Sequence, residues 1–285
     1  MYAITGITGQ VGGALADALF AAGRPFRAVV RDAAKGEAFA ARGAEIAVAA
    51  IDDAAALTRA FEGSEAAFIL LPPDFDPAPD FLTAPDPVIA SIHDALLAAR
   101  PARVVALSTI GADATQPNLL SRLGRMETVL GDLPMPVTLL RAGWFLENIQ
   151  WDIASAREHG VVDSFLAPLD RKIPMVATKD VGELAAQLLD EPGEGVRIVE
   201  LEGPERVSPA DIAASLARAL GREVRAREVA RDAWADRFAA SGMKNPAPRM
   251  RMLDGFNEGW IDFGAGARKG RTGLDAVLAE LLARR

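Results

Sequence analysis

The chain contains no cysteine, two histidines, one tyrosine and five lysines among its 285 residues. The lack of cysteine excludes disulfides, thiol catalysis and thiolate metal ligands. A zinc site would need both His93 and His159 together with carboxylates, and no ligand spacing indicates one, so we expect no metal. His93 falls in an expected helix, and we interpret it as a partly exposed helix residue rather than as a catalytic base.

Long hydrophobic runs and a basic surplus are also missing. No stretch approaches the roughly 18 apolar residues that a membrane span needs. The N-terminus has no basic segment followed by an apolar one, so we expect no signal peptide and a cytoplasmic location. The net charge of -8 argues against a nucleic-acid partner. We therefore expect a small-molecule substrate, no membrane partner, and a monomer or homodimer.

Strand and helix signals alternate through the first half of the sequence. Short apolar runs predict strands, and stretches of helical periodicity that end at glycine lie between them. A segment with six prolines, residues 72–87, is predicted to be a loop. Strands that are apolar throughout indicate a parallel sheet covered on both faces. The expected strands are residues 2–5, 26–30, 45–49, 66–71, 103–107 and 137–140.

This pattern predicts an α/β protein with a Rossmann-type, doubly wound parallel sheet. After about residue 150 the alternation becomes irregular, with a helix at 180–189, a strand at 198–201 and a helix at 209–220 capped by Ser208. We predict a nucleotide-binding domain over residues 1–152. Residues 153–285 are predicted to form a smaller, mixed and mainly helical substrate-binding lobe, some of whose elements return to the sheet.

The turn after the first strand carries the clearest motif. Its sequence, TGITGQVG at residues 5–12, has a G-x-x-G-x-x-G pattern between a strand and an amphipathic helix. Gly6 permits the tight turn, Gly9 lets the backbone approach a diphosphate, and Gly12 lets the helix pack closely on the sheet. Thr8 and Gln10 can add side-chain donors at a helix N-terminus that already favours anions. The turn predicts dinucleotide binding.

The end of the second strand bears on the choice between NADP and NAD. Asp32 lies at the distance expected of a residue that binds the ribose hydroxyls of NAD. Arg31 can instead make a forked contact with the 2′-phosphate of NADP, and Lys35 can help to hold it. Asp32 is also well placed to cap the following helix. We therefore expect NADP(H), with NAD(H) as the alternative.

Four segments together resemble the NmrA-like family of atypical short-chain dehydrogenases. They are TGITGQVG, AVVRD at 28–32, VVALSTIGA at 104–112 and LLRAGWFLEN at 139–148. Residues 200–224 resemble the second-lobe segment of that family. The tail GFNEGWIDFG at 255–264 is similar to a branch that includes the festuclavine and agroclavine dehydrogenases.

The resemblance implies where a bound cofactor and substrate lie. Residues 70–73 are expected beside the nicotinamide ribose, Ser108 and Thr109 facing the nicotinamide, and residues 142–144 in the wall near the substrate. The predicted cofactor-binding residues are Gly6, Thr8, Gly9, Gln10, Val11, Gly12, Arg31, Lys35, Asp52, Leu71, Pro72, Ser108 and Gly143. The predicted catalytic residues are Ser108, Thr109, Trp144 and Asn148.

The proton donor of typical short-chain dehydrogenases is missing. Those enzymes use a tyrosine with a lysine four residues later, whereas Tyr2 lies in the first strand and no lysine occurs from 36 through 171. Hydride transfer to a quinone, enone or imine needs little proton assistance, and positioning alone supplies much of the rate. Beside Ser108 and Thr109, Arg122 and Arg125 are candidate hydrogen-bond donors to the developing charge. Both arginines also fit a solvated helix face, and Glu127 can pair with one of them or with a loop partner.

An aromatic cluster surrounds Asn148. At helical spacing Trp144, Asn148 and Trp151 would share one face, which suits either an aromatic wall for a flat substrate or ordinary core packing. Trp234, Phe238 and Trp260 fit the far side of such a site or the packing of the C-terminal helices, and residues 238–256 suit a lid. We expect an NADP(H)-dependent reductase. The alternatives are a non-catalytic dinucleotide sensor and, ranked last, an isomerase or lyase that retains the cofactor.

Overall fold

In the computed structural model, which describes residues 1–283, eight strands form one parallel sheet. The order across the sheet is β3, β2, β1, β4, β5, β6, β10, β12, and every neighbouring pair is parallel. The chain thus moves outward from β1 in one direction, returns, and continues in the other direction from β4. The strands are β1 Tyr2–Ile4, β2 Phe26–Val30, β3 Glu45–Val48, β4 Ala66–Leu70, β5 Arg103–Thr109, β6 Val137–Ala142, β10 Val196–Glu202 and β12 Arg268–Lys269.

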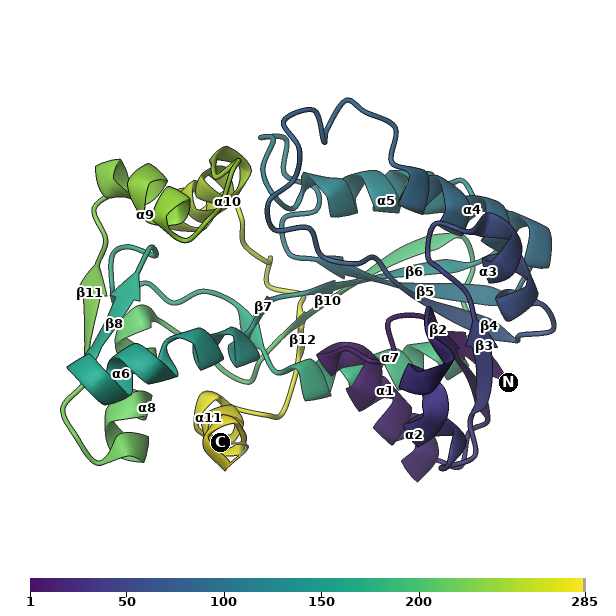
Figure 1. The fold of residues 1–285 in the computed structure, drawn as a ribbon, viewed down its shortest axis with the longest axis horizontal. Helices are drawn as coiled ribbons and strands as arrows, with labels where there is room; N and C mark the ends of the chain where they lie inside the picture. The colour runs from purple at the N-terminus through teal and green to yellow at the C-terminus, as the bar shows by residue number, and fades with distance from the viewer. Residues whose placement is uncertain (284–285) are drawn as a thin grey trace.

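Helices cover both faces of this sheet (Figure 1). One face carries α1 Gln10–Ala21, α2 Glu37–Ala40 and α7 Thr178–Asp190, and the other carries α3 Ala54–Phe61, α4 Pro87–Ala99 and α5 Ser121–Gly131. Alternate strand residues enter two separate cores, as Ile4 does on the first face and Ala3 on the second. The prediction of a doubly wound parallel sheet is confirmed. The sequence signal was reliable because strands that are buried on both faces are apolar at nearly every position.

Helices α1 and α7 lie unusually close together. A side chain on Gly182 of α7 would come within 2.5 Å of the backbone nitrogen of Leu15 in α1. Glycine at this position lets the second helix lie directly against the first. The contact matters for function because α1 begins at the glycine-rich turn.

A smaller lobe lies beyond the carboxyl ends of the strands (Figure 1). Phe165 stacks on Phe238 at 4.7 Å between ring centroids and meets Trp234 edge-on at 5.7 Å. Trp234 and Phe238 are buried, so they hold the helices of this lobe together. The elements of the lobe are α6 Ile153–His159, β8 Val161–Ser164, α8 Pro209–Leu220, β11 Arg225–Glu228, α9 Trp234–Ala240, α10 Ala247–Glu258 and α11 Leu274–Ala283.

The boundary predicted at residue 152 stays a prediction. Two elements from beyond residue 152 return to the first part of the fold. β10 pairs with β6 in the eight-stranded sheet, and α7 packs on α1. Ser208 caps α8 through a reciprocal capping box with Asp211, as its sequence predicts. The helix expected after Asp32 is a 3₁₀ turn, Ala33–Gly36, followed by the short α2.

Sequence patterns did not predict the shortest strands. β7 Trp144–Phe145 pairs with β9 Met175–Val176, and neither strand was predicted. Two-residue strands carry no periodicity, so only their partners define them. Among the helices of the described chain, none is both long and apolar enough to cross a membrane.

Candidate functional site

The turn between β1 and α1 is shaped by close backbone contacts. Gly6 has a φ of +64°, and a side chain there would come within 2.9 Å of Leu70 at the end of β4. A side chain on Gly12 would lie 2.2 Å from the carbonyl oxygen of Gly6. Neither position tolerates a larger residue, because each would force the helix or the neighbouring strand away. The glycine pattern therefore has the geometric role that the sequence predicts.

The start of α1 is open to a ligand. Gly9 is the N-cap residue and no side chain caps it, while the first-turn N–H groups have no acceptor within the helix. Thr8, Gly9 and Gln10 are exposed, whereas Val11 and Gly12 are buried. A dinucleotide diphosphate fits this cradle, because it supplies anionic oxygens to uncapped N–H groups where the backbone has no Cβ to block it. Such a cofactor, when bound in reduced form, supplies a hydride.

Cations mark the end of β2. Arg31 and Lys35 are both exposed, and within residues 1–283 neither forms an ion pair with a carboxylate. Asp32 is engaged by its own helix, since its carboxylate accepts from Ala34 N at 3.1 Å. The capping role predicted for Asp32 is confirmed. The contact of Arg31 and Lys35 with a dinucleotide stays a prediction.

Two aspartates after β3 have different roles. Asp53 caps α3, and its carboxylate accepts from Ala56 N at 2.9 Å. Asp52 is exposed and its backbone carbonyl accepts from Ser91 Oγ at 3.0 Å. The place of Asp52 in the cofactor site stays a prediction.

The carboxyl ends of β4, β5 and β6 lie side by side next to the glycine-rich turn. Thr5 joins the turn to β4, because its hydroxyl donates to the Phe68 carbonyl and accepts from Leu70 N. Leu71 and Pro72 continue from β4, and Gly143 follows β6. A side chain on Gly143 would come within 2.8 Å of the Pro174 carbonyl oxygen. Glycine at this position therefore lets the residue before β9 pack closely against the end of β6. The predicted residues from these three strands are thus brought to one edge.

A buried network of charges underlies that edge. Ser108 Oγ donates to a carboxylate oxygen of Glu127, a residue of α5. Arg141 on β6 grips the same carboxylate through two bonds, of 2.9 Å from Nε and 2.6 Å from Nη2, and reaches Asp113 at 2.8 Å. Ser108, Glu127 and Arg141 are all buried. The hydrogen bond to Glu127 raises the pKa of Arg141, against the opposing effect of burial.

Sequence reasoning missed the roles of Arg141 and Asp113. The partner of Glu127 is Arg141, so its suggested pairing with Arg122 or Arg125 is wrong. A signal was available, because one arginine inside the otherwise apolar run 137–142 must have a buried acidic partner. The pairing joins two elements far apart in the sequence, which helical spacing cannot reveal.

Arg122 and Arg125 instead hold the proline-rich loop. Arg122 binds Asp86 at 2.6 Å and the Pro72 carbonyl at 3.0 Å. Burial opposes ionisation of Asp86, but the bonds from Arg122 and from helix N–H groups outweigh it and hold its pKa below the usual value. Arg125 donates to the carbonyls of Phe81 and Ala84. Both guanidinium groups are therefore structural rather than donors to a reacting group.

The predicted aromatic face is wrong. Trp144 lies in the extended strand β7, and residues 146–151 form a 3₁₀ turn, so Trp144 does not share a helical face with Asn148 and Trp151. Trp144 meets Phe256 of α10 edge-on at 5.2 Å, and both belong to the smaller lobe's core region. Trp151 is 60 % exposed, and Asn148 is half-buried. The aromatic wall beside β6 is thus Trp144 with Phe256.

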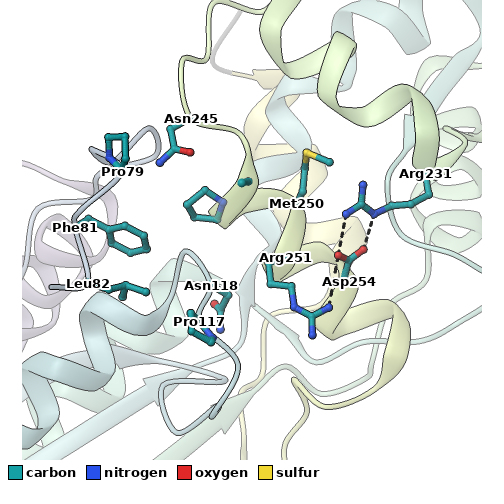
Figure 2. Close-up of a pocket in the computed structure, with 12 residues that line it drawn as sticks. Pro79, Phe81, Leu82, Pro117, Asn118, Arg231, Asn245, Met250, Arg251 and Asp254 are labelled. Carbon is teal, nitrogen blue, oxygen red and sulfur yellow. Dashed lines mark hydrogen bonds and ion pairs between the residues drawn. The ribbon is translucent and has the colours of Figure 1, made fainter.

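A groove of about 490 Å³ separates the proline-rich loop from α10 (Figure 2). Phe81 and Leu82 form one wall, while Met250 and Arg251 of α10 form the opposite one. Arg231 binds Asp254 on that second wall through two bonds of 2.7 and 2.9 Å. The other lining residues are Pro79, Pro117, Asn118, Asn245, Ala247 and Pro248.

At one end of the groove, hydrogen bonds join the proline-rich loop to the segment before α10. The Asp76 carboxylate accepts from the backbone nitrogens of Lys244 and Asn245 at 2.7 to 3.0 Å, and Asn245 Nδ2 donates to the Pro77 carbonyl at 2.9 Å. The two backbone bonds hold the pKa of Asp76 below its usual value. The proline-rich loop therefore contacts both α5 and the segment before α10.

Comparison with known proteins places this geometry in a family. The sequence profile of the NAD(P)H-binding family matches residues 6–192. The chain is 30 % identical to the NAD(P)H azoreductase of Xenophilus azovorans over 229 residues, which cover 79 % of this chain and 76 % of the relative. It is 29 % identical to quinone oxidoreductase 2 of Escherichia coli K12 over 272 residues, covering 95 % and 89 %.

A solved structure agrees with the fold. The Escherichia coli NADPH-dependent quinone oxidoreductase complexed with NADPH superposes with a TM-score of 0.82 at 27 % identity, covering 99 % of this chain and all of the other. The expectations of a Rossmann-type fold, of NAD(P)H as cofactor and of an oxidoreductase of the reductase type are thereby confirmed. Because the family profile spans more than half of the sequence and the chain is 30 % identical to the azoreductase, the chain belongs to the NAD(P)H-binding family.

Proposed function

We propose that the protein is an NADPH-dependent reductase of quinones and related small aromatic or apolar electrophiles. The observation that carries this proposal is the composition of α5, the helix beside β5. Its arginines are bound to the proline-rich loop, and its acidic residue Glu127 is bound to Arg141. Tyr2, the one tyrosine of the sequence, lies in β1. An electrophile that needs no strong acid suits such a site.

The preference for NADPH rests on the end of β2. Arg31 and Lys35 are exposed, and a guanidinium makes forked bonds to phosphate. Asp32, which would otherwise bind the ribose hydroxyls of NAD, is occupied as a helix cap. The similar quinone oxidoreductase of Escherichia coli was crystallised with NADPH, which supports the same choice here.

Substrate is proposed to lie between Trp144 and the groove. The half-buried Trp144, packed against Phe256, offers an aromatic surface beside the end of β6. Phe81 and Leu82 of the proline-rich loop and Met250 of α10 give the groove an apolar lining. Flat rings bind such surfaces through apolar burial and ring stacking. Of the predicted quinone, enone and imine classes, the quinone oxidoreductase relative favours quinones. The azoreductase relative adds azo compounds, a class that the sequence did not predict.

Steady-state assays test the proposal. Purified protein is mixed with NADPH or NADH and with menadione, an azo dye, cyclohexenone or a cyclic imine, and cofactor oxidation is followed by absorbance. We expect turnover of menadione and the azo dye, with kcat/KM at least tenfold higher for NADPH than for NADH. Cofactor binding without oxidation by any compound would refute the reductase, and equal rates with both cofactors would refute the NADPH preference.

The narrower affiliation with NmrA-like proteins and with clavine dehydrogenases stays a prediction. The cyclic imine in this panel tests it, because an iminium carbon accepts hydride without an acid. Turnover of the imine above that of menadione would favour the clavine branch. The same preparation, run on a sizing column, tests the predicted monomer or homodimer.

A further inference from the structure

The lining of the groove differs in charge from the molecule as a whole. The sequence has a net charge of -8. The charged side chains that line the groove are two arginines, Arg231 and Arg251, and one carboxylate, Asp254, so positive charge is in excess there. A hollow lined by one sign of charge attracts ligands of the opposite sign, because its low-dielectric walls concentrate the electric field. The groove therefore suits a ligand with an anionic group.

The two arginines of the groove differ in what they bind. Figure 2 shows both on the same wall, with Asp254 between them. Arg231 binds Asp254 through two hydrogen bonds of 2.7 and 2.9 Å, so its charge is closely paired. Arg251 comes only within 3.8 Å of Asp254 and 3.7 Å of Glu258, and neither distance is that of a hydrogen bond. Within residues 1–283, the N–H groups of the Arg251 guanidinium therefore remain for another acceptor.

The guanidinium of Arg251 is held in place but open to a ligand. It lies over the ring of Trp260, 5.2 Å from the ring centroid, and the side chain of Arg251 is 40 % exposed. Packing on an aromatic face orients a guanidinium and leaves its edge, which carries the N–H groups, accessible. This edge matches a carboxylate or a sulfonate, because each presents two oxygens to a forked pair of donors.

The groove lies among segments that leave the carboxyl ends of the strands. The proline-rich loop, which carries Phe81 and Leu82, follows β4, and Pro117 lies in the loop that follows β5. Leu119 N donates to the Pro248 carbonyl at 3.0 Å, which joins the loop after β5 to α10. Ligands of open α/β sheets bind beyond the carboxyl ends of the strands. The groove is therefore on the side of the sheet where a substrate is expected.

We propose that Arg251 is a specificity residue that selects aromatic substrates carrying an anionic group, a carboxylate or a sulfonate. The anionic group binds the guanidinium of Arg251, while the ring lies against the apolar side chains of Phe81, Leu82 and Met250. Arg251 contributes to substrate binding and not to hydride or proton transfer. The proposal rests on the proposed function, because it places the substrate of that reductase in this groove.

Calorimetry with two unreactive ring compounds, in the presence and absence of NADP⁺, tests the proposal. Naphthalene-2-sulfonate carries the anionic group, whereas naphthalene-2-sulfonamide has the same ring and a neutral group of similar size. The wild-type protein is expected to bind the sulfonate about tenfold more tightly, the gain from charge-assisted hydrogen bonds. In Arg251→Gln the ratio of the two dissociation constants is expected to fall to about one, with little change for the sulfonamide. Arg251→Lys keeps the charge but loses the fork, so a ratio of about three is expected.

Arg268→Gln is the matched control. Arg268 of β12 is 45 % exposed and is also loosely paired, at 3.6 Å from Glu191, but it does not line the groove. Its replacement removes one positive charge, as Arg251→Gln does, and is expected to leave the ratio unchanged. If Arg251 only supports α10 by packing on Trp260, Arg251→Gln will weaken both compounds equally and keep the ratio, which overturns the proposal. An equal fall of the ratio in both variants also overturns it, because a general effect of charge would then be the cause.

The outcomes separate this proposal from the one it rests on. Calorimetry needs no turnover, so the ratio is measured whether or not a substrate is reduced. A protein that oxidises NADPH with menadione but binds neither naphthalene compound, or binds both equally, refutes the anionic specificity alone. A protein that oxidises NADPH with none of the assayed electrophiles refutes the reductase, and with it the substrate role of Arg251, while the ratio still decides whether the groove binds anions.

Discussion

The two halves of the strand-end edge use charge in opposite ways. On the side of β2, Arg31 and Lys35 are exposed and, within residues 1–283, unpaired with any carboxylate. On the side of β5 and β6, Glu127 and Arg141 are buried and bound to each other. The first arrangement leaves cations free for an anionic ligand. In the second arrangement the charges neutralise each other, and Glu127 also holds the hydroxyl of Ser108 at the end of β5.

The difference separates residues whose loss should weaken ligand binding from residues whose loss should weaken folding. An exposed cation adds to the binding free energy only when an anionic ligand is present, and it lowers the stability of the fold very little. A buried ion pair contributes little net stability, yet removing one partner strands the other in a low-dielectric interior. Substitutions on the two sides should therefore affect different measurements, binding on one and folding on the other.

The largest effect is expected from breaking the buried pair. Arg141→Met leaves the Glu127 carboxylate buried without its partner and is expected to lower the free energy of unfolding by about 3–5 kcal/mol. Urea denaturation measures this loss. The double variant Arg141→Met, Glu127→Leu removes both charges and should recover at least half of it. A double variant no more stable than the single one would contradict the account of the pair.

The next effect concerns the turn shared by both sides. Gly12→Ala places a methyl group 2.2 Å from the Gly6 carbonyl oxygen, so the diphosphate cradle must distort. We expect NADP⁺ binding to weaken at least 100-fold by calorimetry, about 2.7 kcal/mol. Gly13→Ala is the control, because its methyl group would lie 3.9 Å from its nearest neighbour, the Ile7 carbonyl oxygen. Similar binding by the two variants would remove the steric argument.

Arg31→Ala tests the exposed side. Losing a forked bond to the 2′-phosphate is expected to weaken NADPH binding about 10- to 30-fold, while NADH binding changes less than twofold. Fluorescence titration with both cofactors measures the two constants, with Arg59→Ala on the neighbouring α3 as the control. Equal losses for NADPH and NADH would mean that Arg31 contacts adenine or ribose rather than phosphate.

The smallest effect extends the comparison to Asp152, a half-buried carboxylate near another acid, Asp163. Burial and then the charge of Asp163 raise the pKa of Asp152 to about 6. Because the folded-state pKa lies above the unfolded one, Asp152 costs stability progressively as pH rises from about 4 through 6. Asp152→Asn should therefore be more stable than wild type at pH 8, by about 1 kcal/mol after allowing for solvent screening, or 2–4 °C in Tm.

Thermal melts at pH 4 and pH 8 measure this difference, which should vanish at pH 4. Asp163→Asn is the opposite control, since hydrogen bonds from Arg227, together with Arg237, hold the pKa of Asp163 low. Its loss should destabilise the protein at pH 8 and matter less at pH 4. A gain for Asp152→Asn that is the same at both pH values would exclude titration as its cause.

Sequence reasoning succeeded where the signal was local. Gly12, the cap at Asp32 and the cap at Ser208 all act within a few residues of their position. It failed at Trp144, because a helical period was applied to a two-residue strand. It also placed the partner of Glu127 on its own helix or in a loop, although the partner is Arg141 on β6.

The sequence by itself determined the order of strands and helices in the first half of the chain, the glycine-rich turn and the place of the one tyrosine in the first strand. These follow from backbone geometry and residue identity, which are properties of short segments. Only the tertiary structure decided that Arg122 and Arg125 secure a loop, that Ser108 donates to Glu127, and that Trp144 meets Phe256. Each of these depends on which distant side chain a group contacts, and burial makes that choice obligatory because polar groups removed from water must find partners.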